Sequence, residues 1–165
     1  MILVTIGSML PFDRMIRAVD IWARENRHED LFAQIGDGQY QPRYMRWERM
    51  LGPREFSQKL DAASLLVAHA GMGTVISAME AGKPIVVMPR RVAYHEVTTE
   101  HQVHTAEWLR DKPGVFVAFS EADLPTALSL AQDHLEMGTN LSSQYGISRS
   151  APAEFVNKVR QFLVE

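Results

Sequence analysis

The residues best suited to chemistry lie in one short segment, HAGMGT, at residues 69–74. An apolar run precedes this glycine-rich turn and a helical apolar pattern follows it, which predicts a buried strand, a turn and a helix. The first N–H groups of such a helix have no intrahelical partner, and the helix dipole attracts anions, so phosphate oxygens can bind there. Gly71 and Gly73 would let the ligand approach the backbone, and the Thr74 hydroxyl can add a hydrogen bond. The alternative is that these glycines serve only a tight turn and close helix packing, because short glycine motifs are common.

Two familiar phosphate-binding motifs are not met elsewhere in the chain. A Walker loop needs Gly-Lys-Ser/Thr, but Gly82-Lys83 is followed by Pro84 and lies at a predicted helix end, where the dipole repels phosphate. A dinucleotide fingerprint needs a third glycine near Ile76 and an acidic residue after the next strand, which here ends in Pro89-Arg90-Arg91. Arginine at that position could accommodate the extra phosphate of NADP, so an NADP-binding protein stays open as an alternative.

Other polar residues admit two interpretations each. His69 can cap a neighbouring loop from the core or donate to a phosphate, and its place at the end of a buried strand favours the second. Glu100, His101 and His104 have helical i, i+3 and i+4 spacing, so a metal site is geometrically conceivable. The zincin pattern is absent after His95-Glu96, and a solvated polar face without metal is the expectation. Nothing local distinguishes Gln102 from a surface glutamine.

These residues are expected to be positioned by alternating strands and helices. Buried strands alternating with helices predict an α/β three-layer sandwich with a mostly parallel sheet, in which ligands bind outside the carboxyl ends of the strands. The predicted strands are 2–6, 31–35, an ambiguous and possibly edge segment 44–51, 65–68, 85–88 and 115–119, and the predicted helices include 53–63, 74–81 and 97–109. We expect one domain over residues 1–165, with a flexible loop at 137–152 and a C-terminal helix at 153–164.

Composition limits the classes of protein that this chain can represent. The 165 residues contain no cysteine, carry a formal net charge of -3, and are 46% hydrophobic, as for an ordinary soluble domain. Disulfide frameworks, thiolate nucleophiles and Cys-ligated metal sites are therefore excluded. The slightly acidic balance argues against broad nucleic-acid binding. No apolar run is long enough to span a bilayer and no signal peptide is evident, so a cytosolic protein is expected.

Seven motifs follow one another along the chain, namely ILVTIGS at 2–8, FD at 12–13, QIG at 34–36, HAGMGT at 69–74, GKP at 82–84, MPR at 88–90 and EHQ at 100–102. In combination, they resemble the C-terminal domain of family 28 glycosyltransferases, the nucleotide-sugar-binding half of GT-B enzymes. The resemblance covers roughly residues 1 to 135 and is far more specific than any single motif. It implies a Rossmann-like fold of the GT-B C-terminal type. It is closest to the free-standing small subunit of two-component bacterial exopolysaccharide transferases and to its eukaryotic counterpart in lipid-linked N-glycan synthesis.

The resemblance also implies which residues bind the donor. The loop of Gly7 and Ser8 and the turn at residues 69–74 would hold the diphosphate, while His101 and Gln102 would reach sugar hydroxyls. One position departs from the family, because the residue that is often acidic and contacts the ribose is Ser77 here. The nucleotide-sugar-binding residues implied are Gly7, Ser8, His69, Gly71, Met72, Gly73, Thr74, Ser77, Arg90, Glu100, His101 and Gln102.

As a function, the resemblance implies the donor-binding catalytic subunit of a heteromeric UDP-sugar glycosyltransferase of hexosyltransferase type. The acceptor, a lipid-linked glycan in surface polysaccharide assembly, and the catalytic base would come with a membrane-associated partner subunit. The chain itself would need no cofactor or metal, would lie in the cytoplasm and be peripheral to the membrane through that partner, and could form homo-oligomers when alone. The alternatives are a non-enzymatic nucleotide-binding or regulatory module and the NADP-binding protein.

Overall fold

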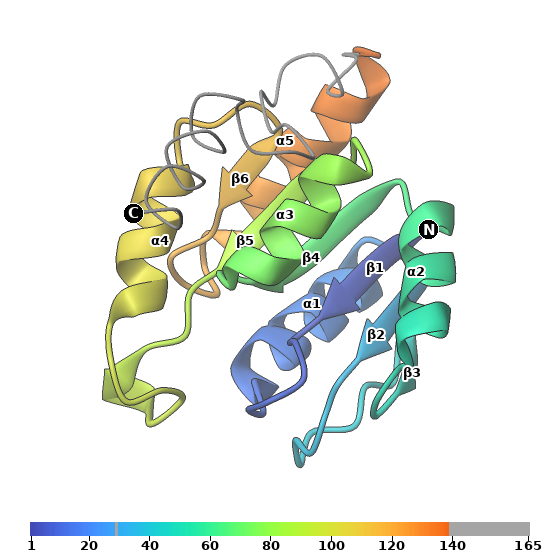
Figure 1. Cartoon of the computed structure of the whole chain (residues 1–165). Helices are drawn as coiled ribbons and strands as arrows, with labels where there is room; N and C mark the ends of the chain where they lie inside the picture. Colours follow the sequence, from blue (N-terminus) through green and yellow to red (C-terminus); the bar gives the residue numbers. More distant parts are fainter. Residues whose placement is uncertain (29, 139–165) are drawn as a thin grey trace, which may run out of the picture.

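The computed structural model describes residues 1–28 and 30–138, which form a six-stranded parallel sheet between two layers of helices (Figure 1). The strand order is β3-β2-β1-β4-β5-β6, and every neighbouring pair in this sheet is parallel. The strands are β1 (Ile2–Thr5), β2 (Leu31–Gln34), β3 (Arg46–Glu48), β4 (Leu65–His69), β5 (Ile85–Met88) and β6 (Val115–Val117). This is the doubly wound order, in which the chain reverses its direction of travel across the sheet between β1 and β4.

Helices cover both faces of this sheet, which confirms the predicted three-layer α/β sandwich. One face packs against α1 (Asp13–Glu25) and α5 (Leu124–Glu136). The other face packs against α2 (Pro53–Ala62), α3 (Met72–Glu80) and α4 (His101–Leu109), with a short 3-10 turn, η1 (Val92–Tyr94), between β5 and α4. Because both faces are covered, the inner strands are continuously apolar rather than alternating, except at the carboxyl ends of three of them, where Thr5, Gln34 and His69 stand.

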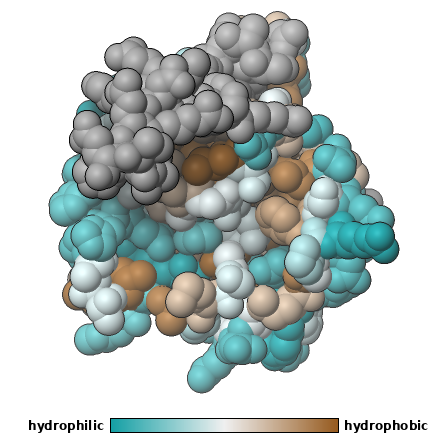
Figure 2. Space-filling model, viewed as in Figure 1, coloured by the Kyte–Doolittle hydropathy of each residue, from teal (hydrophilic) through white to brown (hydrophobic). Residues whose placement is uncertain are grey.

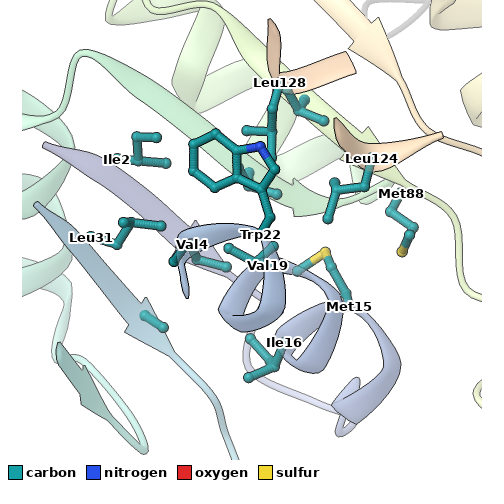
Figure 3. Close-up of a cluster of buried hydrophobic side chains, with 14 of the residues drawn as sticks. Ile2, Val4, Met15, Ile16, Val19, Trp22, Leu31, Met88, Leu124 and Leu128 are labelled. Carbon is teal, nitrogen blue, oxygen red and sulfur yellow. The ribbon is translucent and has the colours of Figure 1, made fainter. Parts of the chain in front are cut away.

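The core between the sheet and the α1/α5 layer centres on Trp22 of α1. Figure 3 shows its indole lying above Val19, between Ile2 on β1 and Leu128 on α5. Met15 on the same helix is completely buried. Complete burial of a side chain of this size contributes about 1.5–3 kcal/mol, so this layer fixes α1 firmly against the sheet. The β1–α1 loop is therefore held at both of its ends.

A buried carboxylate fixes the segment that leads into the edge strand β3. Asp20 on α1 is 1% exposed and accepts hydrogen bonds from the Tyr40 hydroxyl at 2.7 Å and from the backbone N–H groups of Arg43 and Tyr44 at 3.0 and 2.8 Å. Sequence reasoning did not identify this residue. Its partners lie 20 to 24 residues away in the chain, so no local pattern marks it.

Some predicted boundaries were wrong. The helix expected from residue 97 begins at His101, because the Glu96 and Glu100 side chains accept hydrogen bonds from the N–H groups of Arg91 and Val92 and hold the preceding segment as a loop. The helix expected from residue 74 begins at Met72. The ambiguous segment 44–51 is strand only over β3, at the sheet edge. The loop predicted at 137–152 beyond Gly138 and the helix predicted at 153–164 lie outside the described residues.

Candidate functional site

The predicted glycine-rich turns meet at the point where the strand order reverses. The loop after β1 and the turn after β4 lie side by side, because β1 and β4 are direct neighbours in the sheet. Open doubly wound sheets bind their ligands in this crevice. A hollow of about 460 Å³ lies there. It is lined by Ile6, Gly7, Ser8, Met9, Leu10, His69, Gly71, Gly73, Thr74, Arg90 and Gln102.

A second hollow of about 390 Å³ adjoins the first on the side of β2 and α2. Its walls are mostly apolar, and its rim is shared with the first hollow through Gly7, Ser8, Gly73 and Thr74. The remaining lining residues are Thr5, Gln34, Met50, Leu51, Pro53, Phe56 and Ser77. The two hollows form a bipartite site with the start of α3 between them. No residue that lines either hollow is acidic.

The start of α3 supplies free backbone donors to this shared rim. Gly71 is the N-cap residue, and the first intrahelical bond runs from the N–H of Val75 to the Gly71 carbonyl at 3.2 Å. The N–H groups of the three intervening residues, 72–74, thus have no partner within the helix. The first turn contains no acidic side chain. Such a helix start favours an anion.

The loop after β1 is held by the ends of two strands. Gly7 has a φ of 76°, in the left-handed region that favours glycine. Its N–H donates to the Thr5 hydroxyl oxygen at 3.2 Å, and its carbonyl accepts a hydrogen bond from the Gln34 side-chain amide at 2.8 Å. Gln34 in turn accepts from the N–H of Leu51. This glutamine links the rim of the first hollow to the wall of the second.

The imidazole of His69 lies between the two glycine loops. A Cβ atom added to Gly7 would come within 2.7 Å of Cε1 of that ring, and one added to Gly71 would come within 2.7 Å of Cδ2. The glycines thus make room for the ring. Burial, together with the nearby positive charge of Arg90, lowers the pKa of His69 to about 4. His69 is therefore neutral at pH 7 and can donate from one ring nitrogen only.

Arg90 lies beneath the first hollow and is 3% exposed. Its guanidinium donates hydrogen bonds to the carbonyl of Ile6 at 2.8 Å and to that of Leu10, so it shapes the β1–α1 loop from within. Burial lowers its pKa to about 10, against an opposing influence of Glu96, and the group remains a cation at pH 7. Because the lining contains no carboxylate, this charge makes the hollow attractive to anions.

Gln102 is not the surface residue that local sequence suggested. It lies in the first turn of α4, and its side-chain oxygen accepts a hydrogen bond from the backbone N–H of Arg90 at 3.1 Å. This assignment of the amide leaves its NH₂ group free to donate into the hollow that it lines. The Gln102 amide, a neutral hydrogen-bond donor, and the buried Arg90 guanidinium thus lie at the same end of the first hollow.

The other predicted site residues lie apart from the first hollow. Ser77 lines the second hollow and donates from its hydroxyl to the Gly73 carbonyl at 3.0 Å. Glu100 accepts from the N–H of Val92 at 3.1 Å. Met72 and His101 are exposed and are not among the residues lining the hollows. The binding roles of these residues stay predictions.

Sequence reasoning missed the walls of the second hollow. Met50, Leu51 and Phe56 come from the segment around the edge strand and from α2, where the sequence contains no chemical motif. The available signal was topological, since β2 and β3 end at the same sheet edge as β1. Among the described residues, no group of three histidine or acidic side chains is arranged to hold a metal ion. None of the described helices is long and apolar enough to cross a membrane.

The sequence of residues 1–160 matches the family model of the glycosyltransferase family 28 C-terminal domain. No curated protein sequence matches the chain. Solved structures that resemble it include the glycotransferase of kitacinnamycin, with a TM-score of 0.65 at 18% identity, covering 87% of this chain and 37% of that one. The Streptomyces sp. SF2575 glycosyltransferase SsfS6, complexed with thymidine diphosphate, has a TM-score of 0.57 at 16% identity, covering 97% of this chain and 40% of that one.

A third similar structure is matched over nearly its whole length, unlike the first two. The NMR solution structure of ALG13 has a TM-score of 0.56 at 14% identity, and the match covers 88% of this chain and 96% of that one. At such identities the likeness shows the fold, here the GT-B C-terminal type. The chain spans less than half the length of the two glycosyltransferases above, whereas ALG13 is of similar extent.

Proposed function

Since the chain belongs to the glycosyltransferase family 28 C-terminal domain, we propose that it is the donor-binding catalytic subunit of a heteromeric UDP-sugar glycosyltransferase. It transfers a hexose to a lipid-linked glycan in surface polysaccharide assembly. The observation that carries this proposal is the bipartite hollow, which no acidic residue lines and where Gly7, the start of α3 and the buried Arg90 lie close together. The second hollow, the shared rim and the first hollow correspond to the three parts of a nucleotide sugar, which are a nucleoside, an anionic diphosphate and a sugar.

The proposed placement of the donor follows the shape and charge of the two hollows. The diphosphate lies over the shared rim, where the N–H groups of residues 72–74 and the Ser8 and Thr74 hydroxyls can donate to it. The nucleoside occupies the second hollow, whose apolar walls include Met50 and Phe56. The sugar then extends into the first hollow towards Gln102. Thymidine diphosphate in the complex of SsfS6 supports a nucleoside diphosphate as the ligand class.

The chemistry needs little from this chain beyond binding and charge stabilisation. A hydroxyl of the acceptor attacks the anomeric carbon, the bond from that carbon to the β-phosphate oxygen breaks, and UDP leaves with the electron pair. The dipole of α3 and the nearby Arg90 cation stabilise the negative charge that develops on the leaving diphosphate. The proton of the acceptor hydroxyl passes to a base, which we place on the partner because no acidic residue lines the site.

Ligand titration tests the proposal directly. The purified chain is expected to bind UDP and at least one UDP-sugar in isothermal titration calorimetry, and to bind ADP and NADPH at least tenfold more weakly. NADPH is disfavoured because the Arg90 guanidinium is already bonded to the Ile6 and Leu10 carbonyls and is not free to bind a 2′-phosphate. Preferential binding of NADPH, or no binding of UDP, would overturn the proposal.

The acceptor half is proposed to be a separate, membrane-associated subunit that covers the carboxyl edge of the sheet. Exposed apolar side chains flank the hollows there, notably Met9, Met50, Met72 and Tyr94. In the view of Figure 2 the molecular surface shows brown apolar patches among teal polar ones below the centre of the picture. Surfaces of this kind mark interaction sites, and an unpartnered chain with such a surface can self-associate. Binding there would make this chain peripheral to the membrane.

The partner proposal predicts a conditional activity. The purified chain is expected to release UDP from UDP-sugars at background rate with a lipid-linked acceptor, and at least a hundredfold faster once the acceptor subunit is added. Radiolabelled sugar transfer measures this, with Tyr94→Ala, at an exposed residue that lines neither hollow, as a variant expected to weaken the complex but not UDP binding. Efficient transfer by this chain alone would refute the need for a partner, and UDP binding without transfer under any condition would favour the non-enzymatic module.

A further inference from the structure

The sugar end of the hollow is built by one loop, residues 89–100, together with the first turn of α4. This loop carries Arg90 at its start and leads into Gln102 at its end. It contains an exposed 3-10 turn and His95 in the left-handed conformation, with a φ of 57°. A residue with a Cβ atom adopts that conformation only where surrounding contacts impose it. The contacts that hold this loop thus decide where Gln102 lies.

The strongest of those contacts comes from α1. Arg14 forms a two-pronged ion pair with Glu96, with Nε donating to Oε1 at 2.7 Å and Nη2 donating to Oε2 at 2.9 Å. Both side chains are largely buried, at 12% and 10% exposure. The same Nη2 also donates to the carbonyl of Pro89 at 2.9 Å, and Glu96 accepts from the N–H of Arg91 at 2.9 Å. We call the Arg14–Glu96 ion pair and its two backbone hydrogen bonds the clamp. It holds the loop on both sides of Arg90.

The clamp lies outside the proposed ligand site. Arg14 and Glu96 line neither hollow, and α1 is on the opposite face of the sheet from α4. The remaining carboxylate partner of Arg14, Glu121, is 45% exposed, at 3.0 Å. A buried ion pair gains little net stability, because desolvation offsets its attraction, but its directional geometry can select one arrangement of the chain.

We infer that Arg14 and Glu96 are positioning residues, which hold the 89–100 loop so that Gln102 meets the sugar of the donor. The inference rests on the proposed function. The chain of contacts runs from Arg14 through Glu96 to the N–H of Arg91, and from the neighbouring N–H of Arg90 to the Gln102 oxygen. When the clamp is broken, the 89–100 loop can adopt other conformations, and the Gln102 amide is no longer held in one position. The direct contacts to the diphosphate and the nucleoside come from other loops and are retained. Arg90 keeps its place through its own hydrogen bonds to the Ile6 and Leu10 carbonyls.

Calorimetry with UDP and with a panel of UDP-hexoses tests this inference. Glu96→Ala is expected to leave UDP affinity within about twofold of wild type and to weaken the best UDP-hexose about tenfold. Gln102→Ala is expected to do the same. The double variant should be no weaker than either single one, because both changes remove the same contact. Glu121→Gln, which spares the buried ion pair, is the matched control and should change neither affinity.

A second measurement is independent of any ligand. Hydrogen exchange followed by mass spectrometry should show at least tenfold faster exchange of residues 89–100 in Glu96→Ala, with α5 unchanged. If the Glu96→Ala variant does not fold, the same measurement is made on Glu96→Gln. Equal losses for UDP and UDP-hexose, additive effects in the double variant, or unchanged exchange of the loop would overturn the inference. Absence of all UDP binding by the wild-type chain would instead overturn the proposed function.

Discussion

Replacing Gly71 with alanine is expected to weaken UDP binding at least a hundredfold. The added methyl group would overlap Nε2 of the His69 ring and come within 2.7 Å of its Cδ2, closer than real Cβ atoms approach their neighbours. The ring has little room to retreat, because Gly7 lies on its other side, where an added Cβ would come within 2.7 Å of the ring's Cε1. To remove this clash, the two glycine loops would have to move apart or the start of α3 would have to distort. Either change misplaces the donors on which a diphosphate depends, and overpacking of this kind costs about 1–3 kcal/mol in stability as well.

Calorimetry with UDP and thermal melting measure the two effects, and the same turn provides the control. A methyl group at Gly73 meets no atom within 4 Å, so Gly73→Ala should keep the melting temperature of the wild type. The double variant His69→Ala with Gly71→Ala should melt higher than Gly71→Ala, because the clash is gone. If Gly71→Ala bound UDP as tightly as wild type does, the interpretation of this glycine as space for the His69 ring would be wrong.

Acidification is expected to destabilise the protein through His69. The pKa of its imidazole is about 4 in the folded chain, against 6.5 ordinarily, with burial as the main cause and the Arg90 charge as the second. Between these values the unfolded chain binds a proton that the folded chain does not. Stability is therefore fully present above pH 6.5 and falls as the pH drops towards 4, by up to ~3 kcal/mol.

Urea unfolding at several pH values between 7 and 4 measures this loss. Carboxylates contribute their own acid dependence, so the comparison is between wild type and His69→Gln, which keeps a neutral polar group but cannot titrate. The wild-type free energy of unfolding should fall more steeply than that of the variant, and the difference should be confined to the window between pH 6.5 and 4. Parallel curves for the two proteins would show that His69 is not held neutral by its surroundings.

Much of the fold could be predicted because its signals are local. The apolar runs at 2–6, 65–68 and 85–88 predict strands covered on both faces, and each is followed by a turn and a helical pattern. Right-handed crossovers between such units leave few arrangements, and the parallel sandwich is one of them. The glycine-rich turn is equally local, since Gly71 immediately precedes α3 and Thr74 lies in its first turn. For these features, residues a few positions apart determine the structure.

The residues that complete the site could not be predicted in this way. Gln102 has no local signature, and it gains a role only because the sheet brings α4 to the N–H of Arg90. Glu96 likewise has no local signature for its role, because its partner, Arg14, lies 82 residues away. Glu96 and Glu100 also delay the start of the helix predicted from residue 97, because their side chains bond to the loop before it.

Local patterns in the sequence are enough to predict an α/β domain with a glycine-rich turn after a buried strand, because hydrophobic periodicity and glycine placement act within a few residues. Which loops face each other depends on the tertiary structure. Only the strand order sets Gly7 beside Gly71 with the His69 ring between them, and only packing across the sheet lets Arg14 reach the loop that carries Arg90. Both depend on contacts between distant segments, whose energies no short window of sequence contains.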